Sequence, residues 1–593
     1  MSVRAEAPPS RAAPPADPTG EAPNEEPPRP GRRLPPGAAG ALALVLFLTL
    51  AVAALWPGLF TGHNTIVGNT GDPSIFIWSL QWLPFALSHH LNPLLTDYLH
   101  YPTGANLMWN TSILFPALVL TPVTDLFGPI VSYNVLTVLG MSLSGWCAYL
   151  AVRRYSRHWI SAVVGGLIYE FSPFMVVQIT GHAHLFVAVF PPLLVLLVDE
   201  ILVRRRHPAW LMGSVLGLAA ACQLLTGTEL LAISVLMAIP ALVTVAIIFR
   251  SRLRELLPHA LGAAGFAAAT FVVLAGYPLY ILLLGPQHVS GALQGFGYVA
   301  WPTSFLVPSY LELISGASPV LDSSVYIGVP LLILAVAVAV GMRRRAAVLA
   351  AAVTLGCAIV LALGGNLTID GAATGIPLPW LIAQDLPVLD NVLPVRIMVT
   401  GYLALAVIVA IFLDQMLTAP LRWRVAGLAA AAAALIPLIP ALPVSSAQFV
   451  IPAFFTDGGT RQLPTSGSVL MTPYGIQVLD YDTEVWQAVS GIPFRTQLGL
   501  VITPGPGGHE WGVEMDSLGQ ELSALSNSGG AAPATLAPSA RATYLSDLRT
   551  HDVRSVIVGP STGQAQVVQF FTELLGPHGV STGGVVVWFD VHP

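Results

Sequence analysis

The chain has 593 residues, of which 54% are hydrophobic and only 9% are charged, whereas soluble domains carry roughly 25% charged residues. With a mean hydropathy of +0.71, this composition excludes an ordinary soluble protein and predicts an integral membrane protein. The net charge of -6 says little, because in a bilayer the position of a charge matters more than the sum, and we expect no nucleic-acid partner.

Residues 1–37 are rich in Pro, Ala, Glu and Arg without apolar periodicity, so they are predicted to form a disordered cytoplasmic tail. The apolar run from Ala38 is interpreted as a signal anchor that stays in the protein. The three cysteines lie within apolar runs, too far apart for a metal site, and are predicted to be buried without a disulfide: Cys147, Cys222 and Cys357.

Basic residues of the membrane part form arginine clusters, and the chain has no lysine. Each cluster opens or closes a long apolar run. Because cytoplasmic loops hold an excess of Lys and Arg, all the clusters are predicted to face the cytoplasm, and the loops between them, which carry acidic residues, to face outward. The clusters are Arg32/Arg33, Arg153/Arg154/Arg157, Arg204/Arg205/Arg206, Arg250/Arg252/Arg254, Arg343/Arg344/Arg345 and Arg422/Arg424.

A helix needs about 20 apolar residues to cross a bilayer, which predicts a first span at 38–60. Segments 73–90 and 113–127 are short or broken by proline, so they are predicted to be interfacial helices on the outer surface, with Trp78 and Trp82 among the headgroups. If only one of these two segments crossed the membrane, the next arginine cluster, Arg153/Arg154/Arg157, would face outward. Because that cluster is predicted to face the cytoplasm, either both segments cross or neither does. With neither crossing, ten further spans make about eleven: 130–152, 159–177, 183–203, 208–226, 229–249, 258–284, 324–342, 346–364, 395–416 and 425–443.

Apolar character drops after the membrane part, 38–444, and residues 445–593 are predicted to form an extracytoplasmic α/β domain. The predicted strands are Val469–Pro473, Val553–Val558 and Gly584–Val591, and the predicted helices are 482–490 and 564–576. Four residues of this domain fit either a glycan-binding patch or a solvated helix start with a buried anchor, and we expect no catalysis from them: Asp480, Asp482, Glu484 and Trp486.

The first outer loop, residues 61–129, has an acidic residue, Asp72, near its start and directly before the apolar helix that begins at Pro73. Proline suits the first helical turn, and aspartate is a common N-cap. On spacing alone Asp72 is therefore either a structural cap or a carboxylate that takes part in chemistry.

Several features of the chain occur together: one span, a long outer loop with Asp72 near its start, two interfacial helices with HYPTGANL between them, and a second span ending in RRYSR. In this arrangement, which covers most of residues 38–593, the chain resembles the GT-C superfamily of membrane glycosyltransferases. The segments LPVRIMVTGYLALAVIVAIFLD and LMTPYGIQVLDYDTEVWQAVSGIPFRTQLG are similar to those of uncharacterised actinobacterial membrane proteins assigned to that superfamily.

The resemblance implies a hexosyl- or pentosyltransferase that moves a sugar from a polyprenyl-phosphate-linked donor to an envelope glycan, lipid or protein. Transfer would take place at the outer face of the plasma membrane and with inversion. The resemblance also implies that Asp72 is the general base. The loop departs from the commonest family pattern because it holds no basic residue beside the acid, so positive charge for the leaving phosphate must come from elsewhere.

Arg396 is the predicted phosphate partner, because it is the only arginine at an outer span end and a guanidinium suits phosphate. The alternatives are a snorkelling anchor and an ion pair with Asp385 or Asp390. His182 and His184, in ITGHAHLF at an outer turn, are further candidates for the donor phosphate or for a metal, and a polar loop turn is the alternative. No cofactor is predicted, and a divalent metal stays open.

Glu170 and Glu229 fall in or beside apolar runs, where a carboxylate is costly and is a candidate for the substrate pocket by default. For Glu170 a hydrogen bond to a neighbouring helix is an equal alternative. Asp97, His100 and Tyr101, in TDYLHYP, are candidates for the acceptor side of the pocket, although a packed interfacial loop contains the same residue types and is favoured.

Two other functions stay open on this composition. A transporter or lipid flippase also uses many spans and intramembrane carboxylates, but the sequence has no internal repeat and carries a folded outer domain, which an alternating-access core does not need. A non-catalytic envelope scaffold is the third alternative.

Overall fold

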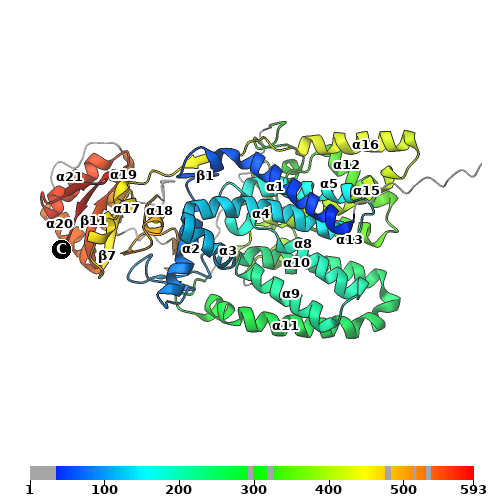
Figure 1. The fold of residues 1–593 in the computed structure, drawn as a ribbon, viewed down its shortest axis with the longest axis horizontal. Coiled ribbons are helices and arrows are strands. Elements are labelled where there is room, and N and C mark those ends of the chain that lie inside the picture. Colours follow the sequence, from blue (N-terminus) through cyan, green and yellow to red (C-terminus); the bar gives the residue numbers. More distant parts are fainter. Residues whose placement is uncertain are drawn as a thin grey trace, which may run out of the picture.

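The computed structural model describes residues 35–290, 298–316, 325–386, 388–474, 482–505, 508–511, 516–528 and 536–593. Residues 1–34 of the predicted tail, and Asp480, lie outside the described residues. In the described part, a bundle of apolar helices carries an α/β domain at one end (Figure 1).

Seven helical stretches among the described residues are long and apolar enough to cross a membrane: Gly37–Phe60, Pro129–Val152, Ala183–Arg204, Thr228–Ile248, Arg250–Leu284, Pro394–Leu417 and Leu421–Leu438. They coincide with seven of the predicted spans and agree with a membrane protein. The other four predicted spans are shorter apolar helices: α5 (Trp159–Glu170), α9 (Ala209–Leu224), α12 (Val329–Gly341) and α13 (Ala346–Ala362). A total of eleven spans therefore stays a prediction.

The long stretches contain helices and short turns whose bounds are α1 Pro36–Phe60, α4 Pro129–Val152, α7 Ala183–Phe186, α8 Phe190–Asp199, α10 Thr228–Ile248, α11 Leu253–Leu284, η5 Pro394–Ile397, α15 Met398–Leu417 and α16 Leu421–Leu435. The span predicted at 159–177 is divided into α5 and α6 (Pro173–Gln178). Proline disfavours helical geometry in the residue before it, and Ser172 there caps α6 by accepting a hydrogen bond from the Met175 backbone N–H at 3.2 Å.

Arginine clusters from different loops meet at one end of the bundle. Arg154 pairs with Glu200 at 2.9 Å, and Arg205 pairs with Glu255 at 2.6 Å. These pairs join the loop after α4, the end of the stretch that contains α8, and the start of α11. The contacts agree with the prediction that these clusters share one side of the membrane; the cytoplasmic identity of that side stays a prediction.

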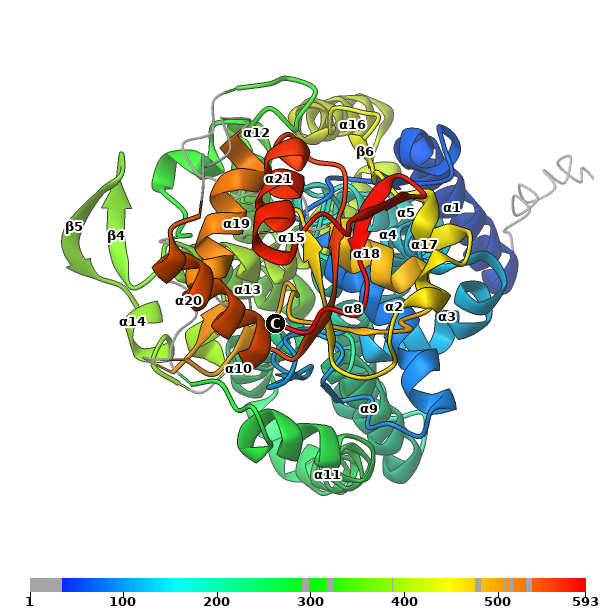
Figure 2. The same cartoon turned by 90° about the vertical axis from the view of Figure 1, so that its left-hand side faces the viewer.

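The C-terminal region contains a five-stranded mixed sheet in the order β12-β13-β11-β7-β8. Strand β7 is parallel to β11 and β8, and β13 is antiparallel to β11. Figure 2 shows α19, α20 and α21 on one side of the sheet and α17 and α18 on the other. The bounds, which overlap every predicted strand and helix, are α17 Ala453–Thr456, β7 Ser468–Thr472, α18 Asp482–Val489, β8 Arg495–Thr496, α19 Ser517–Ser528, α20 Pro538–Thr550, β11 Val553–Val558, α21 Gln564–Leu575, β12 Val580–Thr582 and β13 Val585–Trp588.

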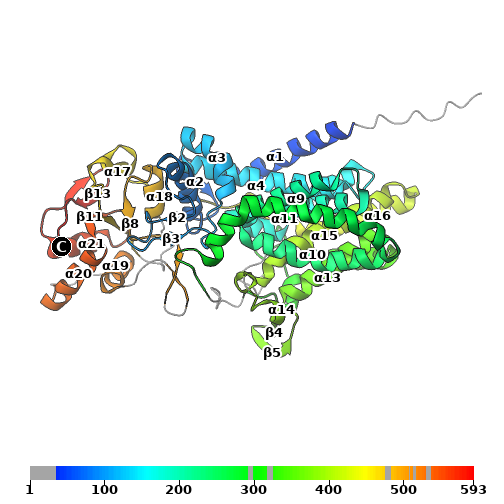
Figure 3. The same cartoon turned by 90° about the horizontal axis from the view of Figure 1, so that it is seen from below.

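Helix α2 (Pro73–Ser88) lies between the bundle and the C-terminal domain (Figure 3). Trp78 and Trp82 are 0% and 1% exposed, and Trp78 Nε1 donates a hydrogen bond to Gln487 Oε1 of α18 at 2.6 Å. The predicted headgroup position of both tryptophans is therefore wrong, because the C-terminal domain covers this helix. Helix α3 (Leu114–Phe127) does expose large apolar side chains, as an interfacial helix requires: Leu118, Val119, Leu126 and Phe127.

The C-terminal domain contacts the membrane part at several places. Strand β6 (Ser446–Gln448) pairs with β1 (Thr65–Val67) of the first outer loop in antiparallel register. Val485, Ile492 and Val501 are buried in the same apolar core as the helices of the bundle. The two parts are therefore packed together at the end of the bundle that holds α2.

Candidate functional site

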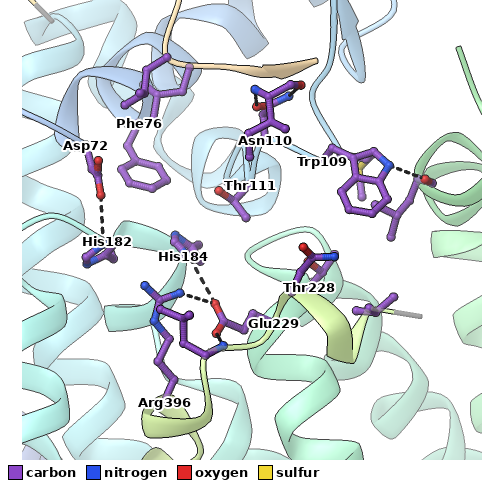
Figure 4. A pocket seen from close by; sticks show the side chains of 18 of the residues that line it. Asp72, Phe76, Trp109, Asn110, Thr111, His182, His184, Thr228, Glu229 and Arg396 are labelled. Atoms are coloured by element: carbon purple, nitrogen blue, oxygen red, sulfur yellow. Dashed lines mark hydrogen bonds and ion pairs between the residues drawn. The ribbon is translucent and has the colours of Figure 1, made fainter. Parts of the chain in front are cut away.

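A cavity of about 580 Å³ lies where the first outer loop, the turn before α8, the start of α10, η5 and the C-terminal domain meet. Figure 4 shows Asp72 directed toward His182, and Arg396 and His184 directed toward Glu229, from these separate segments. Five residues predicted from the sequence line it: Asp72, His182, His184, Glu229 and Arg396.

Asp72 stands at the N-cap position of α2, as predicted, but its side chain makes no capping hydrogen bond. Its Oδ2 instead lies 3.0 Å from His182 Nε2, on the cavity side. Pro73 lacks an N–H and leaves one fewer donor to cap in the first turn. The carboxylate is thus directed into the cavity and not toward its own helix.

A close approach of two backbone segments brings Asp72 to His182. The Asn69 backbone N–H donates to the Thr180 carbonyl at 3.0 Å. Gly68, with φ of +96°, is so near that an added Cβ would lie 2.0 Å from the same carbonyl oxygen. Only glycine fits there without strain.

The surroundings of Asp72 keep it ionised. Burial acts to raise the pKa of Asp72, but the hydrogen bond and charge of His182, with the charges of His184 and Arg396, hold that pKa below its usual value. Asp72 is therefore a carboxylate at neutral pH, able to accept a proton.

The membrane side of the cavity holds a buried ion pair. Arg396 Nη1 lies 2.7 Å from Glu229 Oε2, and each side chain is 10% exposed. His184 Nε2 is 3.8 Å from the same oxygen, and the Leu393 backbone N–H donates to Glu229 Oε1 at 3.3 Å. Arg396 is thus paired with Glu229 instead of the acidic neighbours considered from the sequence.

The Asp72–His182 pair lies next to the group formed by Arg396, Glu229 and His184. The ring centroids of His182 and His184 are 6.1 Å apart. One side of the cavity therefore offers the Asp72 carboxylate beside His182, and the other offers the Arg396 guanidinium, paired with Glu229, beside His184. A carboxylate suits proton transfer from a hydroxyl, and a guanidinium suits a phosphate.

Glu170 does not belong to this cavity. It is the last residue of α5 and is 0% exposed, packed so closely against α4 that a Cβ at Gly145 would lie 2.8 Å from its own Cβ. Its side chain is enclosed between helices, away from the residues that line the cavity.

The segment TDYLHYP contacts the C-terminal domain rather than the cavity. Asp97 pairs with Arg495 at 2.8 Å. The His100 and Tyr101 backbone N–H groups donate to the Leu498 and Thr496 carbonyls at 3.4 and 3.0 Å. Asp97, His100 and Tyr101 therefore do not line this cavity, and their contacts are those of the favoured alternative, a packed loop.

Several cavity residues have no counterpart among the predicted site residues. From the first outer loop and α10 come Phe76, Trp109, Asn110, Thr111 and Thr228, and from the C-terminal domain come Leu500 and Ile502. The polar run WNTS at 109–112 is the signal that could have indicated the loop residues. Nothing in the sequence near position 500 indicates that the C-terminal domain reaches the cavity.

The part of the chain that the structure describes contains no group of three or more His, Cys, Asp or Glu residues that could hold a metal ion. His182 and His184 each face a carboxylate, those of Asp72 and Glu229. Among the groups that line the cavity, the Arg396 guanidinium suits an anion and the Asp72 carboxylate suits a hydroxyl.

The sequence matches no family model and no curated protein. Among solved structures, the chain is similar to the oligosaccharyltransferase of Archaeoglobus fulgidus in the apo form, at 11% identity and a TM-score of 0.44, over 87% of this chain and 69% of that one. It is also similar to the archaeal oligosaccharyltransferase AglB from Archaeoglobus fulgidus in complex with an inhibitory peptide and a dolichol-phosphate, at 11% identity, a TM-score of 0.43 and the same coverage.

Proposed function

We propose that this protein transfers a sugar from a polyprenyl-phosphate-linked donor to a hydroxyl group of an envelope glycan, lipid or protein at the outer face of the plasma membrane. The observation that carries the proposal is the direction of Asp72. Its carboxylate leaves the helix that it precedes without a side-chain cap and faces a cavity that also contains Arg396, His182 and His184.

In the proposed reaction the acceptor oxygen attacks the anomeric carbon of the sugar while Asp72 takes the proton of that hydroxyl. The bond from the anomeric carbon to the phosphate oxygen breaks on the opposite face, and its electron pair leaves with the polyprenyl phosphate, so the configuration inverts. His182 keeps Asp72 ionised and oriented. Arg396, held by Glu229, and His184 stabilise the charge of the leaving phosphate.

A second cavity supports a donor with a lipid tail. It measures about 220 Å³ and is lined mainly by Ala, Val and Leu side chains of α8, α10, α13 and α15. Arg396 lines the first cavity, and Thr400, one helical turn further along the chain, lines the second. On α10, Glu229 lines the first cavity and Met237, two turns further, lines the second. An apolar chain attached to a phosphate beside Arg396 would run along the helices that line the second cavity.

The test is sugar transfer by the full-length protein in proteoliposomes, with radiolabelled polyprenyl-phosphate sugars supplied one sugar at a time. Replacing a general base with an isosteric amide removes the proton acceptor, which is worth about 10²- to 10⁴-fold. We therefore expect Asp72→Asn to transfer sugar at least about 100-fold more slowly than the wild-type protein.

Asp125→Asn is the matched control, because Asp125 is an exposed carboxylate of the same outer loop that does not line the cavity. It should keep the wild-type rate. Equal transfer by Asp72→Asn and wild type would show that Asp72 is not the base, and absence of transfer from every donor would favour the transporter or scaffold alternatives.

A further inference from the structure

Glu484 joins the C-terminal domain to the start of α2. Its side chain is buried, with 2% of the residue exposed, instead of forming the solvated helix start considered from the sequence. Ser74 Oγ donates a hydrogen bond to Glu484 Oε2 at 3.0 Å, and the Leu500 backbone N–H donates to Glu484 Oε1. One carboxylate is therefore bonded to the residue two positions after Asp72 and to a residue that lines the cavity.

The segment 498–502 of the C-terminal domain forms one wall of that cavity. Leu500 and Ile502 line it, on the side of the first outer loop. Asn110 holds Ile502 from that loop: its Nδ2 donates to the Ile502 carbonyl at 3.1 Å, and its Oδ1 accepts from the Ile502 backbone N–H. The wall is thus attached at position 502 by Asn110 and at position 500 by Glu484.

An ion pair, Arg495 with Asp97, also joins the C-terminal domain to the first outer loop, and it is a weaker contact. Arg495 and Asp97 are 2.8 Å apart, but their side chains are 29% and 47% exposed. An exposed pair is screened by water, whereas a buried carboxylate must be hydrogen-bonded, and loss of its partners is costly. Glu484 is therefore expected to hold the wall more firmly than the exposed Arg495–Asp97 pair does.

We propose that Glu484 is a positioning residue that fixes the segment 498–502 against the start of α2 and so sets the shape of the acceptor side of the cavity beside Asp72. The C-terminal domain thereby completes the site, although it contributes no group that reacts. The role in acceptor binding rests on the function proposed above, and the structural link between Ser74, Glu484 and Leu500 does not.

Hydrogen exchange of the full-length protein in nanodiscs, followed by mass spectrometry, tests this link without any substrate. Two peptides report on it, 68–76 at the start of α2 and 496–503 in the wall. A hydrogen bond to a buried charged group is strong enough that its loss changes local opening by about tenfold or more. We expect Glu484→Ala to raise the exchange rate at least about tenfold in both peptides.

Two variants keep this test interpretable. Glu484→Gln retains an acceptor for Leu500 and a partner for Ser74, so its exchange should stay within about threefold of wild type. Ser74→Ala changes only α2, yet it should raise exchange in 496–503. The control Asp97→Asn breaks the exposed pair and should leave both peptides unchanged. Wild-type exchange of 496–503 in both Glu484→Ala and Ser74→Ala would overturn the proposal, as would an equal effect of Asp97→Asn.

Transfer kinetics separate this role from general destabilisation. With a donor that the wild-type protein uses, Glu484→Ala should raise the acceptor KM about tenfold while kcat stays within about threefold, and Glu484→Gln should restore the KM. An unchanged acceptor KM would contradict the role in acceptor binding. If the wild-type protein transfers no sugar, the proposed function fails, but the exchange result still decides whether Glu484 holds the wall.

Discussion

Two carboxylates near the start of α2 have opposite surroundings. Burial acts to raise the pKa of Asp72, but His182 and the nearby cationic side chains hold it below its usual value. Burial and, to a smaller extent, the charge of Asp72 raise the pKa of Glu484 to about 7, in spite of its hydrogen bonds from Leu500 and Ser74. At neutral pH Asp72 is ionised and Glu484 is partly protonated, which is the division of roles that neighbouring groups impose.

Glu484 should make the stability of the protein pH-dependent. Because its pKa in the folded protein lies above its ordinary value of 4.5, the unfolded chain loses this proton first, and stability falls as the pH rises from 4.5 to about 7. Glu484→Gln should remove this pH-dependent contribution to the free energy of unfolding, which is on the order of 3 kcal/mol. Melting followed by tryptophan fluorescence between pH 5 and 8 measures it.

We predict that the difference in melting temperature between Glu484→Gln and the wild-type protein shifts in favour of the variant as the pH rises. A difference that stays the same at every pH would contradict this prediction. Asp72 does not interfere, because a lowered pKa gives stability that is present above the ordinary value of 3.8 and is lost only as the pH falls below it.

At the scale of elements, a buried ion pair joins α10 to η5 at the membrane side of the cavity. Glu229 begins the first turn of α10, and Arg396 lies in η5 just before α15. The pair brings together two helices that also line the second, apolar cavity. Its removal should therefore affect the packing of the bundle as well as the site.

We expect Arg396→Met to destabilise the protein by about 3–5 kcal/mol, because the Glu229 carboxylate is left buried without its cation. The double variant Arg396→Met/Glu229→Met should recover most of this loss, since no buried charge remains. Thermal unfolding in nanodiscs measures both. Arg205→Met breaks an exposed pair with Glu255 and should have a far smaller effect. Equal losses in the two single variants would contradict this account.

At the scale of the whole molecule, patterns local in sequence predicted the elements well. The runs of apolar residues between arginine clusters coincide with helices, and the alternation after Ser445 predicted three strands of the sheet and two of the helices beside it. Of the cavity residues, Glu229 could be named because a carboxylate beside an apolar run is costly, and Arg396 because it is the only arginine at a predicted outer span end. Asp72 could be named from the family resemblance, and His182 and His184 from their place in a polar outer turn.

Contacts between distant segments could not be predicted in this way. Trp78 has the composition of an interfacial residue, and only the docking of α18 explains why it is buried. The same docking places Asp97 against Arg495 and brings Leu500 to the cavity. Glu170 shows the converse, since its burial in the bundle is visible only once α4 and α5 are packed.

The central claim is that Asp72 acts as a base in a cavity shared by the membrane part and the C-terminal domain. The most direct measurement compares donor binding with single-turnover sugar transfer in Asp72→Asn, with radiolabelled polyprenyl-phosphate sugars as probes. We predict that donor affinity stays within about threefold of wild type while the transfer step slows by about 10²- to 10⁴-fold. Transfer at the wild-type rate by Asp72→Asn would contradict the account.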